Sequence, residues 1–147
     1  IVIGTSKLAD RLQINIKKFP GAILTYLSQI TLAARAYNKI VIDGPHNDVA
    51  DEFSCEASAR SAFQLGFDGK AVIHPIQIEY INDIFTPKKE DVEKAINMLG
   101  AYEEAQKDGK EVILFEDEMV DKYQVKWSHR MITLYDKYKE LGQDNFI

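Results

Sequence analysis

Residues 66–87, GFDGKAVIHPIQIEYINDIFTP, place a short apolar run directly before a His-Pro pair and a helical pattern. The run Ala71 to Ile73 has the unalternating apolar character of a strand that is buried on both faces. Pro75 has no N–H to donate, so it ends the strand. Apolar residues then recur at helical spacing, at Ile78, Ile81, Ile84 and Phe85. We therefore expect His74 and Pro75 at the carboxyl end of a strand, where parallel sheets and barrels bind ligands.

Two further runs share this character, and helical patterns separate them. The predicted strands are Ile1 to Ile3, Ile40 to Ile42 and Ala71 to Ile73, each short and followed by Gly or Pro turn residues. The predicted helices cover residues 24–37, residues 52–65 and the segment after the last strand. The order β-α-β-α-β-α favours a parallel sheet. Three such units are too few to close an eight-stranded barrel, but they are enough to be the last three of one.

The chain beyond residue 87 is more highly charged. Residues 88–107 predict a long amphipathic helix, whose apolar side contains Val92, Ala95, Ile96, Leu99 and Tyr102. An extended stretch is expected at 112–115, and the acidic run 116–118 interrupts it. A last helix is predicted from about Val125 to Leu141, with Gly142 at its end.

The chain is therefore divided into residues 1–87, which hold the three βα units, and residues 88–147, which form a helical extension. Its first residue is Ile1 instead of Met, and a strand-like run begins there at once. Three βα units alone would expose unpaired strand edges and an apolar half-core. We therefore expect the sequence to be part of a longer chain.

The composition excludes several classes of protein. A net charge of -5 without a basic face argues against nucleic acid as a partner. No apolar run approaches the roughly 18 residues that a membrane span requires. Cys55 is the only cysteine, so we expect a reduced setting, the cytoplasm or an organelle matrix, and a thiol buried as a small hydrophobe.

Four segments resemble the second half of the citrate lyase beta-subunit-like proteins. They are GTSKLADRL at 4–12, LAARAY at 32–37, IDG at 42–44 and the block at 66–87. That family includes malyl-CoA and citramalyl-CoA lyases and belongs to the aldolase/citrate lyase superfamily of TIM barrels. The resemblance implies an α/β chain, the C-terminal part of a TIM (β/α)8 barrel, with a helical extension and a lid segment around 111–123.

The resemblance also implies a magnesium-dependent carbon–carbon lyase. Such an enzyme cleaves or condenses a 3-hydroxy-dicarboxylyl-CoA, such as malyl-CoA or citramalyl-CoA, through an enolate, giving an acyl-CoA and a 2-oxo acid. This chemistry requires a cation that polarises the carbonyl and a carboxylate that moves the proton. The expected partners are the CoA ester, the 2-oxo acid and further copies of the chain, in a trimer or hexamer whose lids reach neighbouring subunits.

The metal-binding motif of the family departs from its pattern here. The family holds magnesium with a Glu, which would lie upstream of Ile1, and with the Asp of a GxxD motif. That motif reads Gly4-Thr5-Ser6-Lys7 in this chain, so Ser6 and Lys7 are expected to contact the substrate and no metal ligand is assigned. Three interpretations stay open for Lys7. Its ammonium replaces the metal; the protein has lost lyase activity and only binds an acyl-CoA; or Asp10 supplies an oxygen ligand. An exposed Lys7 without a role is a fourth.

Two further sets of site residues follow from the resemblance. The segment FEDEMVDKY at 115–123 resembles the family's lid, and Asp121 matches the acid that exchanges a proton with the acyl-CoA methyl carbon. A solvated acid in an acidic loop is the alternative for Asp121. Ile73, His74 and Pro75 match positions that contact the CoA moiety or the bound substrate, whereas a purely structural role is the alternative for His74.

Polar residues after the second predicted strand carry a weaker signal. Asp43 either hydrogen-bonds at the barrel mouth or caps the turn that follows it. His46 and Asp48 lie in the next loop, and a His-x-Asp pair by itself is weak evidence for a metal site.

Overall fold

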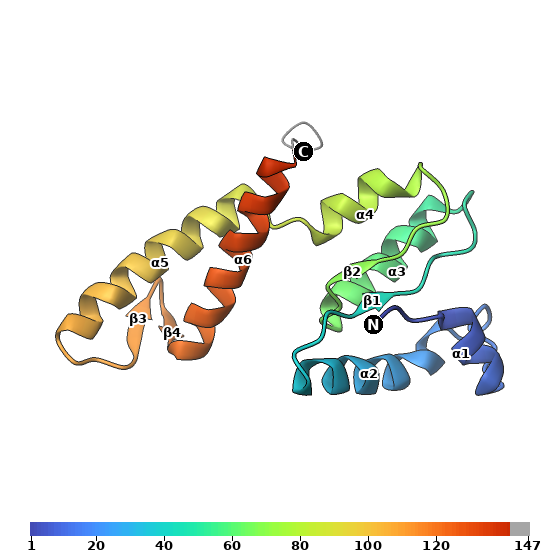
Figure 1. The fold of residues 1–147 in the computed structure, drawn as a ribbon, viewed down its shortest axis with the longest axis horizontal. Helices are drawn as coiled ribbons and strands as arrows, with labels where there is room; N and C mark the ends of the chain where they lie inside the picture. Colours follow the sequence, from blue (N-terminus) through green and yellow to red (C-terminus); the bar gives the residue numbers. More distant parts are fainter. Residues whose placement is uncertain (142–147) are drawn as a thin grey trace. The chain divides into compact units, whose positions relative to one another are not determined.

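The computed structural model describes residues 1–141, and the chain divides into two compact units, Ile1–Phe85 and Thr86–Ile147 (Figure 1). Gly142, the predicted end of the last helix, lies outside the described residues. No helix in the described part of the chain combines the length and the apolar character that a membrane span requires.

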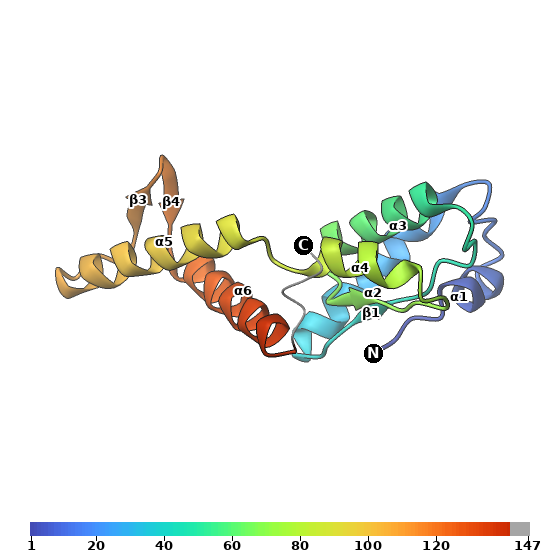
Figure 2. The same ribbon diagram turned by 90° about the horizontal axis from the view of Figure 1, so that it is seen from above.

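The first unit alternates helices with short strands, as the sequence pattern predicts. Its elements are α1 (Thr5–Arg11), the 3-10 helix η1 (Pro20–Ile23), α2 (Leu24–Ala36), β1 (Ile42–Asp43), α3 (Glu52–Gln64), β2 (Gly69–Lys70) and α4 (Gln77–Phe85). The three helices predicted in this part of the chain are confirmed as α2, α3 and α4. Figure 2 shows α3 and α4 side by side, and the two helices contact each other.

The strands form a small parallel sheet. β1 pairs with β2 in the register Ile42↔Gly69 and Asp43↔Lys70. On the other side of β1, Val2 forms an isolated parallel bridge with Ile42. The backbone N–H of Ile42 donates to the carbonyl oxygen of Ile1 at 2.8 Å, and the N–H of Ile3 donates to that of Ile42 at 2.9 Å. Three parallel segments therefore lie in chain order, which confirms the predicted α/β pattern.

The predicted strand at Ala71 to Ile73 is wrong. The ladder runs two residues earlier, at Gly69–Lys70, and its last bond joins the Ala71 N–H to the Asp43 carbonyl oxygen at 2.9 Å. The Ile73 N–H is already bonded to a side chain of α4, so the ladder does not extend through it. Ile73 is also 54% exposed, which contradicts burial on both faces.

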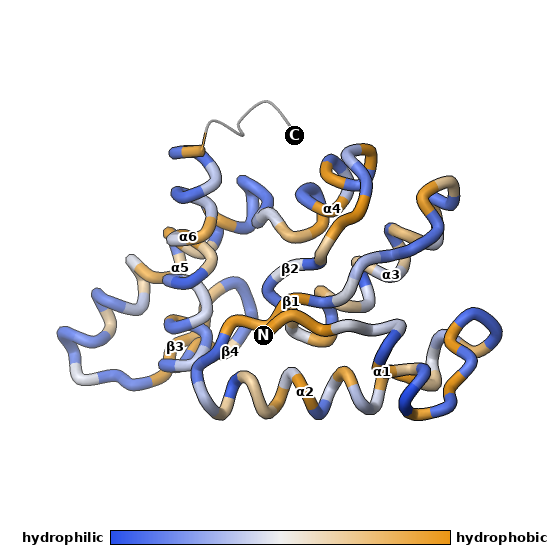
Figure 3. The backbone as a smooth tube through the Cα atoms, turned by 45° about the vertical axis from the view of Figure 1, so that its right-hand side comes forward, coloured by the Kyte–Doolittle hydropathy of each residue, from blue (hydrophilic) through white to orange (hydrophobic). Residues whose placement is uncertain are grey.

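The two faces of the sheet have different surroundings. Ile3 and Val41 are 8% and 0% exposed and belong to the main hydrophobic cluster, which includes residues of α2, α3 and α4. Val2 and Ile40, which have the opposite parity, are 68% and 67% exposed. The tube in Figure 3 is strongly apolar around the amino terminus. The helices therefore cover one face of the sheet and leave the other face apolar and open.

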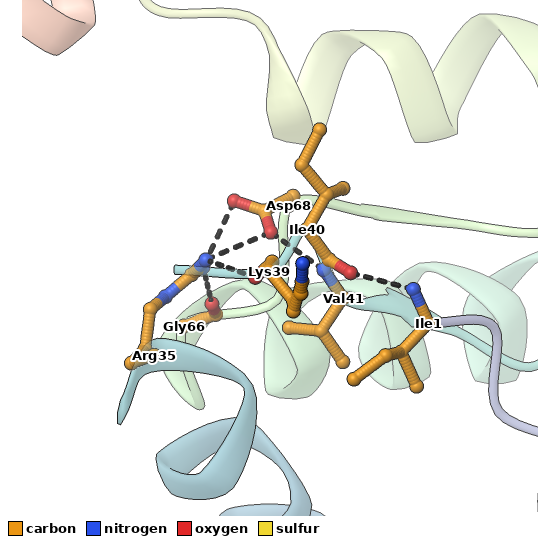
Figure 4. Close-up of polar contacts among 7 residues, drawn as sticks. All are labelled: Ile1, Arg35, Lys39, Ile40, Val41, Gly66 and Asp68. Carbon is orange, nitrogen blue, oxygen red and sulfur yellow. Dashed lines mark hydrogen bonds and ion pairs between the residues drawn. The ribbon is translucent and has the colours of Figure 1, made fainter. Parts of the chain in front are cut away.

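Ionic contacts fix the end of the sheet at which the strands begin. Arg35 at the end of α2 donates to both carboxylate oxygens of Asp68, at 2.9 and 2.8 Å, and to the carbonyl oxygen of Gly66 at 2.5 Å (Figure 4). Asp68 also accepts from the Val41 N–H at 2.8 Å. The Arg35 side chain is 37% exposed, so the ion pair adds little to the free energy of folding. Its main effect is to align α2 with the strands.

Cys55 is buried, as predicted. It is 2% exposed and lies with Ala59 and Ala62 on the covered side of α3. Burial raises the pKa of its thiol, so the reactive thiolate is disfavoured. By contrast, Phe53 on the same helix is 84% exposed.

The second unit is a helical hairpin with a small β-hairpin between its helices. α5 spans Lys89–Lys107, β3 Ile113–Phe115, β4 Glu118–Val120 and α6 Lys122–Glu140. The predicted helix at 88–107 is confirmed, and its buried residues include Val92, Ala95, Leu99 and Tyr102. Ile96 is 52% exposed, so its placement on the apolar side was wrong.

The acidic run interrupts the extended stretch, as predicted: Glu116 and Asp117 form the turn of a β-hairpin, and Glu118 begins β4. Glu116 and Asp117 have φ values of 46° and 64°, which let the chain reverse between β3 and β4. The last helix begins at Lys122, three residues before the predicted Val125, because Asp121 caps it.

Candidate functional site

The candidate site is the edge of the parallel sheet at which the strands end. Residues 4–7 follow the first parallel segment, residues 44–48 follow β1, and residues 71–76 follow β2. Because carboxyl ends of parallel strands meet at one edge, these three segments share a surface, which we call the strand-end edge.

A buried ion pair lies beneath this edge. The ammonium nitrogen of Lys70 is 2.5 Å from Oδ2 of Asp43, and the two side chains are 3% and 5% exposed. Lys70 also donates to Oγ of Ser58 on α3 at 2.9 Å. The Thr5 hydroxyl, in the first turn of α1, donates to Oδ1 of Asp43 at 3.3 Å. One pair of opposite charges thus joins the ends of β1 and β2 to two helices.

The loop after β1 lies directly against the start of α1. A Cβ atom on Gly44 would lie 2.7 Å from the Ile3 carbonyl oxygen and 2.9 Å from the Thr5 nitrogen, so this close approach requires glycine. Beside it, the side-chain amide of Asn47 donates to the Ser6 hydroxyl at 2.8 Å. Residues 4–7 are therefore held in position by contacts with the loop that follows β1.

Gln77 connects the loops after β1 and β2, a role that sequence reasoning missed. Its side chain is 1% exposed; Nε2 donates to the His46 carbonyl oxygen at 3.0 Å, and Oε1 accepts from the Ile73 N–H at 3.0 Å. His74 Nδ1 accepts from the Ile76 N–H at 3.2 Å. The signal available in the sequence was a polar residue in the first turn of an otherwise apolar helix face.

The residues expected to contact the substrate lie at the strand-end edge, apart from Asp121. Ser6 and Lys7 are exposed, and the Lys7 stem lies over Gly4, where an added Cβ would be 3.8 Å from Lys7 Cβ and Cδ. Ile73, His74 and Pro75 are exposed in the loop after β2. β1 lies between the first parallel segment and β2. Ser6 and Lys7 therefore lie on one side of the end of β1, and Ile73, His74 and Pro75 lie on the other.

Asp121 belongs to the second unit and has a structural role of its own. It is the N-cap of α6, where Oδ1 accepts from the Tyr123 N–H at 2.7 Å. The Gln124 side chain accepts from the Asp121 N–H in return, which completes a capping box.

An open groove lies beside the edge, between α1 with residues 13–24 and α3. Ser6, Asp10, Asp43 and Lys70 are among its lining residues, whereas Lys7 and His74 are not. Its apolar and polar lining is mixed, and we assign no ligand to it.

The side chains at the edge do not by themselves fit magnesium. Over residues 1–141, no three His, Cys, Asp or Glu side chains come together in a group that could hold a metal ion. The buried carboxylate of Asp43 already pairs with Lys70, and Lys7 brings a further positive charge to the turn after the first strand segment. A cation repels a metal ion, so these side chains alone do not form a magnesium site.

The pKa of Asp51, next to the strand-end edge, provides a test of its hydrogen bonds with Ser54. Asp51 caps α3: Oδ2 accepts from the Ser54 hydroxyl at 2.6 Å and Oδ1 from the Ser54 N–H at 2.9 Å. The hydroxyl bond first, and then the backbone bond, hold the pKa of Asp51 below its ordinary value of 3.8. Its contribution to stability is therefore present above that ordinary value and is lost as the pH falls through the lower folded value.

Replacing Ser54 with alanine is expected to raise the pKa of Asp51 toward 3.8, because the side-chain hydrogen bond is its largest cause. The measurement is an NMR titration of the Asp51 carboxyl carbon. Ser61→Ala is the matched control, since the Ser61 hydroxyl on the same helix donates to the Ala57 carbonyl oxygen instead. An unchanged Asp51 pKa in Ser54→Ala would contradict this assignment.

Sequence comparison identifies a consistent group of relatives. No family model matches the sequence. The (3S)-malyl-CoA thioesterase of Cereibacter sphaeroides is 35% identical over 82% of this chain and 42% of its own length. Mitochondrial citramalyl-CoA lyase of Rattus norvegicus is 34% identical over 95% of this chain and 41% of its own. Citrate lyase subunit beta of Leuconostoc mesenteroides is 33% identical over 90% and 45%. The chain therefore spans less than half the length of these relatives.

Solved structures give the same result for the fold. CitE of Mycobacterium tuberculosis, determined with magnesium, acetoacetate and coenzyme A, aligns with a TM-score of 0.63 and 29% identity, over 75% of this chain and 40% of that protein. A citrate lyase from Burkholderia xenovorans aligns with a TM-score of 0.72 over 96% of this chain and 45% of that one. At 20% identity, the second likeness shows the fold alone. The chain thus has an α/β fold, mostly helical, similar to citrate lyase beta-subunit structures.

Proposed function

Because this chain belongs to the citrate lyase beta-subunit-like family, we propose that it forms part of an enzyme that acts on CoA esters of hydroxy-dicarboxylic acids. The leading activity is carbon–carbon lysis of a malyl-CoA or citramalyl-CoA type of substrate into an acyl-CoA and a 2-oxo acid, or the reverse condensation. The observation that carries this proposal is the 34% identity to a citramalyl-CoA lyase over 95% of the chain.

At the strand-end edge, we assign the first turn of α1 and the loop after β2 to different parts of the substrate. Ile73, His74 and Pro75 contact the CoA ester, and Ser6 and Lys7 contact the carboxylate end. The Lys7 ammonium supplies there the positive charge that orients the substrate carboxylate and polarises the adjacent carbonyl. Its exposed position over Gly4, at the end of the first strand segment, supports this role.

The second candidate activity is hydrolysis of the same CoA ester. It is favoured by the 35% identity to a malyl-CoA thioesterase. The two reactions break different bonds. Lysis breaks a carbon–carbon bond and releases a 2-oxo acid and an acyl-CoA, whereas hydrolysis adds water across the thioester and releases a hydroxy-dicarboxylic acid and free CoA. A third candidate is a relative that binds an acyl-CoA without turnover, because Lys7 stands where the family has a metal ligand.

Product analysis separates these candidates. The protein, expressed at its full natural length, is incubated with malyl-CoA and with citramalyl-CoA, in magnesium and in EDTA. We expect the 2-oxo acid and acyl-CoA in both buffers. Turnover that stops in EDTA would contradict the role of Lys7 in place of the metal. Free CoA without a 2-oxo acid would identify a thioesterase, and CoA binding without products would identify a binding protein.

The larger assembly is also proposed from the family. The open face of the sheet, with Val2 and Ile40 exposed, supports packing against further strands in a TIM barrel. We further propose a homo-oligomer, a trimer or hexamer, in which the lid segment 111–123 brings Asp121 to a neighbouring subunit. The proposed location is the cytoplasm or an organelle matrix, in keeping with the free Cys55.

A further inference from the structure

The buried pair of Lys70 and Asp43 is unusual for its surroundings. Ile3 and Val41, which lie on the same covered face of the sheet, are apolar and buried. Removing two charges from water costs several kcal/mol for each ion, and a well-packed apolar pair is often as stable or more stable. The pair is therefore not explained by stability alone.

The ion pair is connected to both segments that we assign to the substrate. Lys70 is the last residue of β2, directly before the loop that carries Ile73, His74 and Pro75. Asp43 is the last residue of β1, and its second oxygen accepts from the Thr5 hydroxyl. Thr5 immediately precedes Ser6 and Lys7.

From these contacts we propose that Asp43 is a positioning residue, which sets the first turn of α1, with Ser6 and Lys7, through the Thr5 hydroxyl, and that Lys70 supplies its buried counter-charge. Lys70 balances the charge of the buried Asp43 carboxylate: its ammonium bonds Oδ2 at 2.5 Å and leaves Oδ1 for Thr5. The Ser58 hydroxyl fixes the ammonium from α3. This proposal rests on the proposed function, since it assigns Ser6 and Lys7 to the substrate.

Two double variants separate the effect of the hydrogen bond to Thr5 from the effect of the charges of Asp43 and Lys70. Asp43→Asn with Lys70→Met removes both charges but keeps an oxygen that accepts from Thr5. Asp43→Leu with Lys70→Met removes both charges and that acceptor. Neither leaves a buried charge unpaired, so both variants are expected to fold.

We expect turnover of the CoA ester to separate these variants. The leucine variant should lose about tenfold in kcat with less than about threefold change in KM, because misplaced groups slow the chemical step. The asparagine variant should stay within about threefold of the parent kcat. Thr5→Val should behave like the leucine variant, and Thr5→Ser, which restores the hydroxyl, should recover the rate. Equal rates in the leucine and asparagine variants would overturn the proposal.

A second readout does not depend on activity. The rate at which an amine-reactive acetylating reagent modifies Lys7 is measured by mass spectrometry, with the exposed Lys39 as the internal reference. The Lys7 to Lys39 ratio is expected to change in the leucine variant and in Thr5→Val but not in the asparagine variant. If the parent protein turns over no CoA ester, the proposed function fails and this ratio still tests the positioning. An unchanged ratio in all variants would contradict it.

Discussion

Replacing Lys70 with methionine is expected to lower the free energy of unfolding by about 3–5 kcal/mol, because the Asp43 carboxylate then remains buried without its counter-charge. The side chains of the pair are 3% and 5% exposed, so water cannot take the place of the ammonium without local opening. The measurement is urea denaturation at neutral pH, in which the midpoint should fall while the slope stays unchanged.

The matched control is Lys39→Met, which removes an exposed lysine of the same unit and is expected to change stability by less than about 0.5 kcal/mol. Adding Asp43→Leu to Lys70→Met should recover most of the loss, because no unpaired charge remains. A double variant as unstable as Lys70→Met alone would show that the loss comes from packing of the lysine stem.

Replacing Asp121 with asparagine is expected to lower turnover of the CoA ester by about 10²- to 10⁴-fold, the range for loss of a general acid or base. Asparagine caps a helix as well as aspartate does, so the start of α6 should remain intact. Stability should therefore be unchanged while the proton-transfer group is lost. Steady-state kinetics and thermal denaturation of the same preparation measure the two effects.

A second variant separates the capping role of Asp121 from its proposed role in proton transfer. Asp121 accepts from the Tyr123 N–H as the N-cap of α6. Asp121→Ala removes both the carboxylate and the cap, and it should lose about 1 kcal/mol of stability in addition to the activity. If Asp121→Asn retains full turnover, Asp121 is only the cap of α6. If Asp121→Ala loses activity and Asp121→Asn does not, the loss comes from the missing cap, and Asp121 is again only the cap of α6.

The longer helices were predictable from the sequence because their signals extend over several turns, whereas the seven-residue α1 was not predicted. Apolar spacing over several turns located α2, α3, α4 and α5, with differences of at most a few residues at their ends. The strands of the parallel sheet, β1 and β2, contain only two residues each, so their register depends on contacts between distant segments. Two backbone bonds decide where β2 lies: the Asp68 N–H donates to the Val41 carbonyl oxygen, just before β1, and the Ala71 N–H donates to the Asp43 carbonyl oxygen, at its end. No local pattern encodes them.

The candidate site was predictable as a location but not as a network. The carboxyl end of the strands followed from the order of strands and helices, and His74 lies in the expected loop. Lys70 carried no signal, because a lysine after a glycine in a turn is ordinarily solvated. Its burial depends on Asp43, which lies 27 positions earlier in the chain. The role of Asp121 as a cap depended on reading Gln124 three residues later, a local signal that the charged surroundings obscured.

The Gln77 side chain has a consequence for motion at the mouth of the site. Its amide bonds one loop through the His46 carbonyl oxygen and the other through the Ile73 N–H, and it is 1% exposed. Neither loop can swing outward alone without leaving a buried amide group unbonded. We therefore expect the loops after β1 and β2 to move together, because displacing either one alone breaks a buried hydrogen bond of Gln77.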